Sequence, residues 1–198
     1  AGGLHGVGSS VVNALSEDLV ATIRRDGQEY QQKFSRGKSK GPIKVINKSI
    51  RGTGTTIFFR PDTEIFPSIV FSSDILRQTI QSRAYLNPGL KIRFIDETAG
   101  TEEELYYPEG IKAYLKQLLD KKKTKIIGEE PFFIERKDDI EVSMAFAWTE
   151  STREEFLSYA NGIFTMDGGS HEQGAKSGIA KAVRNYTTVH DISLKGVK

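Results

Sequence analysis

Four glycines between residues 2 and 8 have the spacing of a loop whose backbone can approach an anion closely. A helical pattern follows directly, with Val11, Val12 and Leu15 on one apolar face. Glycine tolerates positive φ, and the first turn of a helix presents free N–H groups to an anion such as phosphate. The spacing matches neither the dinucleotide fingerprint nor the lysine-bearing phosphate loop. From the glycines alone, a phosphate-binding loop and a purely structural loop are equally good interpretations.

The elements that must position this loop mix strands and helices. The Asp26-Gly27 pair between two strand-like runs is the signal for a tight hairpin turn. A flexible basic connection is expected at 35–41, and an acidic turn at 96–104. Strands are predicted at residues 19–25, 28–34, 43–46, 55–60, 90–94, 105–107, 131–136, 140–148 and 155–160. Besides the first helix, helices are predicted at 73–86, 109–119 and 170–186.

Composition excludes several classes of protein. The chain has 198 residues, 37% of them hydrophobic and 27% charged, with a net charge of +2, as in an ordinary globular protein of one large or two small domains. It contains no cysteine, which excludes a disulfide framework, a thiol nucleophile and a thiolate metal site. No apolar run reaches the roughly 18 to 20 residues of a membrane helix. We therefore expect a cytoplasmic protein with no membrane partner.

A charge run at residues 120–125 ends the helix predicted at 109–119. Three strand-like segments follow it in succession. This change of pattern predicts a domain boundary there, with residues 1–125 in the first domain and 126–198 in the second.

Five sequence words occur in order along the chain, and together they extend over nearly all of it. They are GGLHGVGSSVVNALS (2–16), GTGTTIFFRPD (52–62), SRAYLNPGLKIRFID (82–96), YPEGIKAYL (107–115) and MDGGSHEQGAKSGIAKAV (166–183). This set resembles the B-type ATPase subunits of bacterial type II DNA topoisomerases, DNA gyrase B and topoisomerase IV B. Chaperone and mismatch-repair ATPases share the Gly-x-x-Gly-x-Gly pattern but lack the neighbouring words.

The resemblance implies an ATP site in this chain. The residues that it implies around the triphosphate are Gly3, Leu4, His5, Gly6, Val7 and Gly8. Thr55 matches a family threonine that helps to hold adenine through a water. Judged by residue type alone, Thr55 is better explained as a β-branched residue that fills a strand, and His5 as a loop residue that does not contact a ligand.

The resemblance also implies a fold and an activity. The fold would be α+β: the C-terminal part of a two-layer α/β sandwich of the gyrase, chaperone, kinase and mismatch-repair ATPase type, then a partial transducer domain of mixed sheet and helices. The activity would couple ATP binding and hydrolysis to dimer closure and DNA strand passage. The implied cofactors are ATP and Mg²⁺, and the implied partners are DNA, the A-type DNA-cleaving subunit and a second copy of the ATPase subunit.

Several residues that the family needs are missing from this sequence. The general-base glutamate and the Mg²⁺-binding asparagine precede the glycine loop in the family, and its catalytic lysine stands in a Gln-Thr-Lys word. No such word occurs here, and Arg77-Gln78-Thr79 belongs to an unrelated predicted helix. We therefore expect an internal piece, without a catalytic residue or a metal ligand, that does not hydrolyse ATP alone. The alternatives are a noncatalytic nucleotide-binding or regulatory module and a related chaperone or mismatch-repair ATPase.

The helix predicted at 170–186 has a basic face. Lys181 and Arg184 lie opposite a predicted apolar stripe of Ala175, Ile179, Ala182 and Tyr186. Such a face fits contact with DNA phosphates, and the family's DNA cavity favours this interpretation. A solvated outer face is the simpler alternative. The acids at 96–104 lack a histidine and are interpreted as hydrated loop residues, with no metal site.

Overall fold

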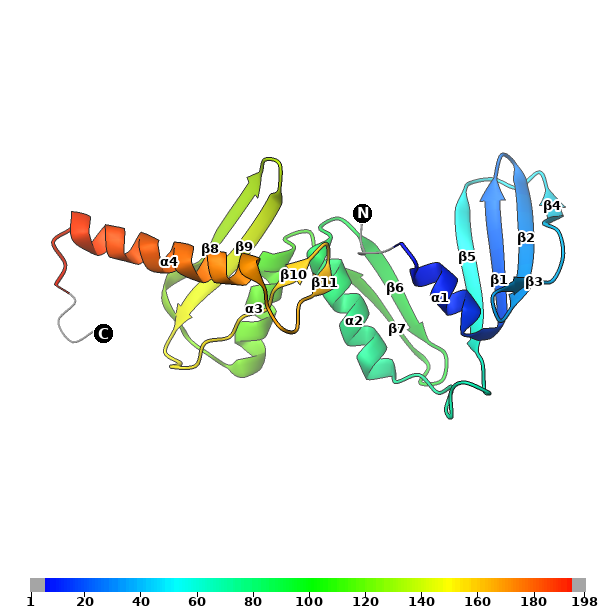
Figure 1. Ribbon diagram of the computed structural model, residues 1–198, viewed down its shortest axis with the longest axis horizontal. Coiled ribbons are helices and arrows are strands. Elements are labelled where there is room, and N and C mark those ends of the chain that lie inside the picture. Colours follow the sequence, from blue (N-terminus) through cyan, green and yellow to red (C-terminus); the bar gives the residue numbers. More distant parts are fainter. Residues whose placement is uncertain (1–5, 194–198) are drawn as a thin grey trace. The chain divides into compact units, whose positions relative to one another are not determined.

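The computed structural model describes residues 6–193, and their helices and strands are labelled in Figure 1. The helices are α1 (Gly8–Ala14), α2 (Ser73–Leu86), α3 (Ile111–Lys122) and α4 (Ser170–Val189). The strands are β1 (Ser16–Arg25), β2 (Gln28–Ser35), β3 (Lys38–Ser39), β4 (Lys44–Lys48), β5 (Gly54–Pro61), β6 (Lys91–Asp96), β7 (Thr101–Tyr106), β8 (Ile126–Lys137), β9 (Glu141–Thr149), β10 (Tyr159–Ala160) and β11 (Ile163–Phe164). This mixture of helices and antiparallel strands confirms the α+β class.

The described chain divides into two compact units. The sheet unit consists of residues 6–80 and 94–102, and the C-terminal unit consists of 81–93 and 103–193. Helix α2 and the β6–β7 pair contribute residues to both units. The domain boundary predicted at residue 125 is not tested by this division and stays a prediction.

The sheet unit is built on β1, which pairs antiparallel with β2 on one side and with β5 on the other. The strand order is β3-β2-β1-β5, and β4 also pairs with β2. Asp26 and Gly27 join β1 to β2 with φ of 53° and 72°, which is the pair of positive values that a type I′ turn requires. The predicted hairpin is therefore confirmed.

One face of this sheet is apolar, and only part of it is open to solvent among the described residues. The alternation of side chains along β1 and β5 places Leu19 opposite Phe59 and Ile23 opposite Thr55 on the same face. Ile57 lies between these two pairs on β5 and is 51% exposed. Thr55 is therefore part of the apolar face of the sheet.

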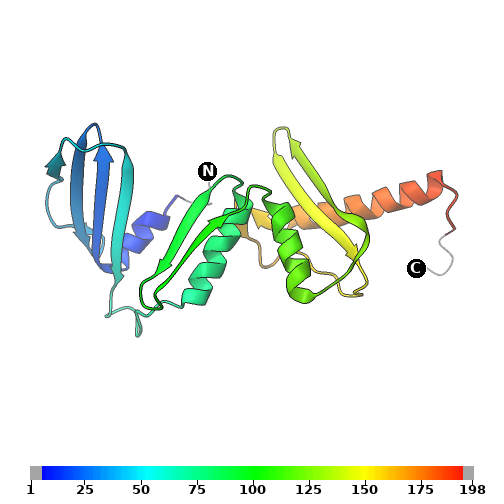
Figure 2. The same ribbon diagram turned by 180° about the vertical axis from the view of Figure 1, so that it is seen from behind.

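The C-terminal unit has its own core around the end of α2. Tyr85 stacks between the rings of Tyr107 and Tyr114, with centroids 3.8 and 4.8 Å away. Ala84 and Leu105 are completely buried. The β8–β9 pair and α4, seen from behind in Figure 2, complete this unit.

Three local predictions are wrong. Residues 155–160 do not form a strand, except for Tyr159–Ala160 in β10, because side chains hold this segment: Ser158 Oγ shares a hydrogen bond with Thr165 Oγ1 and Lys122 pairs with Glu155. The acidic turn is shorter than 96–104, because Asp96 accepts the N–H groups of Thr98 and Ala99 and β7 then begins at Thr101.

The connection at 35–41 is also not a flexible link. Arg36 and Gly37 form a second tight turn, with φ of 50° and 78°, and β3 folds back on the end of β2.

The apolar stripe predicted on α4 is only partly covered. Ala175 and Ile179 are half-buried, whereas Ala182 is exposed and Tyr186 is 59% exposed. No helix of the described residues is both long enough and apolar enough to cross a bilayer.

We predict that Leu105→Ala lowers the free energy of unfolding of this chain by about 2 to 5 kcal/mol, because it opens a cavity at a completely buried site. Urea unfolding measures the change. Ile140→Ala, at a residue that is 74% exposed, is the control and should cost less than about 0.5 kcal/mol. Equal losses in the two variants would contradict the assignment of Leu105 to the core.

Candidate nucleotide-binding loop and its base

The glycine loop ends in a short helix whose first residues are open to solvent. Gly6 has φ of +66°, and an added Cβ there would meet nothing within 4 Å, so the backbone conformation rather than space demands glycine. Val7 caps α1 through its backbone, without a side-chain hydrogen bond, and is 51% exposed. The backbone of Gly6, Val7 and Gly8 is therefore accessible to an anion. The other expected loop residues, Gly3, Leu4 and His5, lie outside the described residues.

The opposite end of α1 is fixed to the sheet by backbone hydrogen bonds from two other segments. The N–H of Gly37 donates to the carbonyl oxygen of Asn13 at 3.0 Å, and the N–H of Arg36 donates to that of Ser16 at 2.7 Å. The N–H of Asp62 donates to the carbonyl oxygen of Leu15 at 3.0 Å. Figures 1 and 2 both place α1 at the end of the sheet where β1 begins and β5 ends. We call these contacts the base of α1.

An ion pair joins the same two segments. Arg36 Nε donates to Asp62 Oδ2 at 2.5 Å, and Arg36 Nη2 donates to Oδ1 at 3.1 Å. Oδ1 also accepts the N–H of Glu64 at 3.0 Å, and Arg36 Nη2 lies 2.6 Å from the exposed Glu64 Oε1. Asp62 is only 1% exposed, so these donors replace the water that its charge would otherwise bind. The bonds from Arg36, and then that from the Glu64 N–H, hold the pKa of the Asp62 carboxyl below its usual value.

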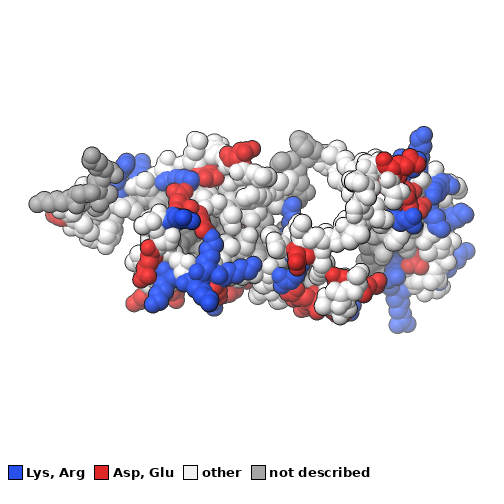
Figure 3. Space-filling model, turned by 90° about the horizontal axis from the view of Figure 1, so that it is seen from below, with Lys and Arg blue, Asp and Glu red and all other residues white. Residues whose placement is uncertain are grey.

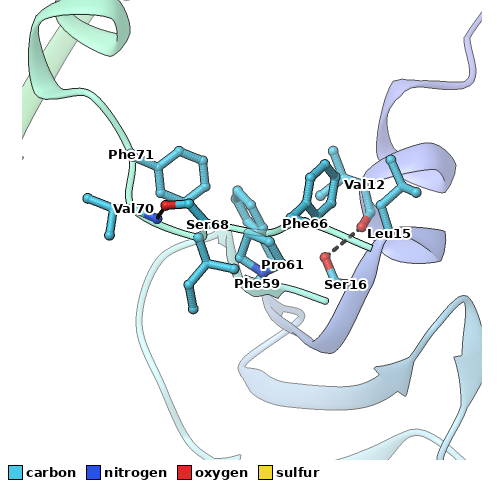
Figure 4. A pocket seen from close by; sticks show the side chains of 10 residues that line it. Val12, Leu15, Ser16, Phe59, Pro61, Phe66, Ser68, Val70 and Phe71 are labelled. Carbon is cyan, nitrogen blue, oxygen red and sulfur yellow. Dashed lines mark hydrogen bonds between the residues drawn. The ribbon is translucent and has the colours of Figure 1, made fainter. Parts of the chain in front are cut away.

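An apolar pocket of about 310 Å³ adjoins the base of α1. Figure 4 shows its lining side chains, which come from α1, from the paired ends of β1 and β5, and from the segment after β5. They are Val12, Leu15, Ser16, Phe59, Pro61, Phe66, Ser68, Ile69, Val70 and Phe71. Ser16 turns its hydroxyl away to donate to the Val12 carbonyl oxygen at 2.6 Å.

Thr55 lies far from the base of α1. Thr55 lies at the start of β5 opposite Ile23, whereas α1 meets the sheet near Ser16. Seven residues separate these two positions on β1, which corresponds to about 23 Å at roughly 3.3 Å per residue. This distance separates Thr55 from the base of α1, and the glycine loop lies at the opposite end of that helix. The roles expected for Thr55 and for the loop stay predictions.

The two residues expected to face DNA lie in the C-terminal unit. Lys181 and Arg184 are exposed on α4, and neither makes an ion pair with another described residue. Basic and acidic side chains are interspersed on the face of the molecule seen in Figure 3. The DNA contact stays a prediction.

The loop and the acidic residues differ in how well they fit an ATP–Mg²⁺ complex. The accessible backbone and positive φ at Gly6 fit a phosphate chain. Among residues 6–193, no group of three or more His, Asp or Glu side chains is placed to hold a metal ion.

These features define an α+β protein in which a glycine loop leads into a short helix and then an antiparallel sheet. A family model described as DNA gyrase B matches residues 110–198. The chain is 43% identical over 185 residues to DNA gyrase B of Campylobacter jejuni, and 41% identical over 186 residues to DNA topoisomerase 4 B of Bacillus subtilis. Each alignment covers 93% of this chain, but only 24% and 28% of those relatives.

A solved structure agrees with these matches. The 43K ATPase domain of Thermus thermophilus gyrase B, in complex with an aminocoumarin, is similar with a TM-score of 0.82 and 35% identity. The similarity covers 98% of this chain and 53% of that one. The chain belongs to the family of DNA gyrase B and topoisomerase IV B proteins.

The sequence analysis missed the Arg36–Asp62 pair. Arg36-Gly37 and Pro61-Asp62 both have turn-forming residues, but 26 positions separate the two charges. Their pairing follows only once β2 and β5 are known to flank β1.

We predict that Asp62 makes the stability of the chain dependent on pH. Because its folded-state pKa is lowered, the ionised carboxylate stabilises the fold fully above its unfolded pKa of about 3.9, and this contribution is lost as the pH falls toward the folded value. Wild type should therefore be more stable than Asp62→Asn at pH 7, and the difference should shrink below about pH 4. Urea unfolding between these pH values measures it. Glu150→Gln, at an exposed residue that forms no ion pair with another described residue, is the control, and an Asp62→Asn difference that stays constant with pH would contradict the prediction.

Proposed function

We propose that this chain is the ATP-binding part of the ATPase subunit of a type II DNA topoisomerase, which couples ATP binding and hydrolysis to dimer closure and DNA strand passage. The observation that carries the proposal is the 43% identity to a DNA gyrase B over 93% of the chain. The accessible backbone at Gly6 adds physical support, because a loop of this kind suits a triphosphate.

In this proposal the loop formed by Gly3, Leu4, His5, Gly6, Val7 and Gly8 surrounds the triphosphate. Backbone N–H groups of the loop donate to phosphate oxygens, which needs no charged side chain. Thr55 contributes to adenine binding through a water. Mg²⁺ would neutralise the phosphates, with its protein ligand outside these residues.

The proposed partners follow from the same activity. A second copy of the ATPase subunit would pair with the first when ATP binds, and the A-type subunit would cleave the DNA. Lys181 and Arg184 would contact the phosphates of the duplex, because both cations are exposed on α4 and form no ion pair within the described chain.

We predict that Gly6→Val in the gene product that carries this sequence weakens binding of a nonhydrolysable ATP analogue by at least about tenfold, because a β-branched residue strongly disfavours positive φ and moves the loop N–H groups. Calorimetric titration measures the affinity. Gly100→Val is the matched control, since Gly100 has the same φ of +66° and equally open surroundings but lies in the β6–β7 turn. Unchanged affinity in Gly6→Val would remove the phosphate-loop assignment.

For α4, we predict that the double change Lys181→Gln and Arg184→Gln weakens DNA binding. Each lost phosphate contact lowers the slope of log affinity against log salt by about one unit, so the slope should fall by about two. Lys38→Gln with Lys44→Gln carries the same change of charge on the sheet unit and should leave the slope unchanged. A slope equal to that of wild type in the α4 variant would assign this face to solvent.

A further inference from the structure

We propose that Arg36 and Asp62 are positioning residues, whose ion pair fixes the base of α1 and thereby sets where the glycine loop lies against a bound triphosphate. The proposal rests on the proposed function and adds to it two residues that stand outside the loop. The part of the ligand that Arg36 and Asp62 affect is the terminal part of the phosphate chain.

The short connection between α1 and the sheet makes the base of α1 decisive. Only Leu15 separates α1, which ends at Ala14, from β1, which begins at Ser16. The direction of α1 therefore depends on the segments that bond to this junction. Those segments are the Arg36-Gly37 turn and the end of β5 at Asp62.

The turn lies directly against the end of α1. A Cβ added at Gly37 would lie 3.4 Å from the Cα of Ala14, and φ at Gly37 is +78°. The positive φ favours glycine here, and the distance is that of ordinary van der Waals contact. Movement of the turn would therefore move the end of α1 with it.

No side-chain hydrogen bond to Asn13 Oδ1 from the described residues helps to hold the end of α1, whose apolar side chain Val12 packs in the pocket at the base. Asn13 Oδ1 is buried and accepts no hydrogen bond from any described residue. The three backbone bonds at the base of α1 carry the attachment instead. Two of their donors belong to Arg36 and Asp62, the same residues that form the ion pair.

The opposite end of α1 amplifies any tilt at the base. The helix has seven residues, so its length is about 10 Å, and a tilt of about 20° would displace its first turn by about 4 Å. A hydrogen bond between an N–H group and a phosphate oxygen is lost over a much smaller displacement. Val7 is half exposed, so its side chain packs only in part against the rest of the structure.

A single side-chain substitution can remove the Arg36–Asp62 ion pair from the base of α1. Arg36→Gln leaves the buried carboxylate of Asp62 without its charged partner, which favours rearrangement of the turn. Arg60→Gln is the matched control: Arg60 pairs with Glu17 at 2.5 Å on the same sheet, and neither residue contributes a backbone bond to the base of α1. The two variants lose the same charge from the same sheet.

The test compares three ligands in the gene product that carries this sequence: a nonhydrolysable ATP analogue, ADP and adenosine, each with Mg²⁺. Arg36→Gln should lose at least about tenfold of the preference for the triphosphate over adenosine, which corresponds to one charge-assisted hydrogen bond. Its affinity for adenosine should stay within about twofold of wild type, since Thr55 lies far from the base of α1 along β1. Arg60→Gln should match wild type for all three ligands.

Each outcome has one meaning. A wild-type protein that does not prefer the triphosphate would overturn the proposed function itself. If wild type shows the preference and Arg36→Gln retains it, or loses affinity equally for adenosine and the triphosphate, the positioning role is wrong. If Arg36→Gln fails to fold, the double variant Arg36→Gln with Asp62→Asn removes the uncompensated charge, and the same comparison of ligands decides the question.

Discussion

The buried carboxylate of Asp62 is the charge around which the functional end of the sheet unit is organised. It binds the guanidinium of Arg36 through both oxygens, and its own backbone N–H holds Leu15 at the end of α1. A buried charge is costly unless donors surround it, so this pair ties the β2–β3 turn, the end of β5 and the start of β1 to one arrangement. The glycine loop takes its position from that arrangement.

The loop itself needs freedom of the backbone rather than charge. Gly6 holds a left-handed conformation in open surroundings, and the short helix that follows presents its first residues to solvent. The base of α1 is rigid and the loop is accessible, which is the combination that binding of a phosphate chain by N–H groups requires. The residues that set the geometry of the loop therefore differ from the residues that would touch the ligand.

Local signals in the sequence predicted local structure well. Asp26-Gly27 predicted the β1–β2 hairpin correctly, and the helix predicted at 73–86 has the same bounds as α2. The strand prediction was wrong for residues 155–158, because the alternation of apolar and polar residues cannot show that side chains, rather than a partner strand, hold this segment. The Arg36–Asp62 pair could not be found because it depends on which strands flank β1. The glycine loop was found through its resemblance to a family, since its glycines alone left a structural loop equally good.

The most direct test of the account is a crystal structure of the gene product that carries this sequence, bound to a nonhydrolysable ATP analogue and Mg²⁺. The account predicts phosphate oxygens within about 3 Å of the backbone nitrogens of Val7 and Gly8, with the Arg36–Asp62 ion pair intact at the base of α1. A triphosphate bound elsewhere, with this loop empty, would contradict the central claim.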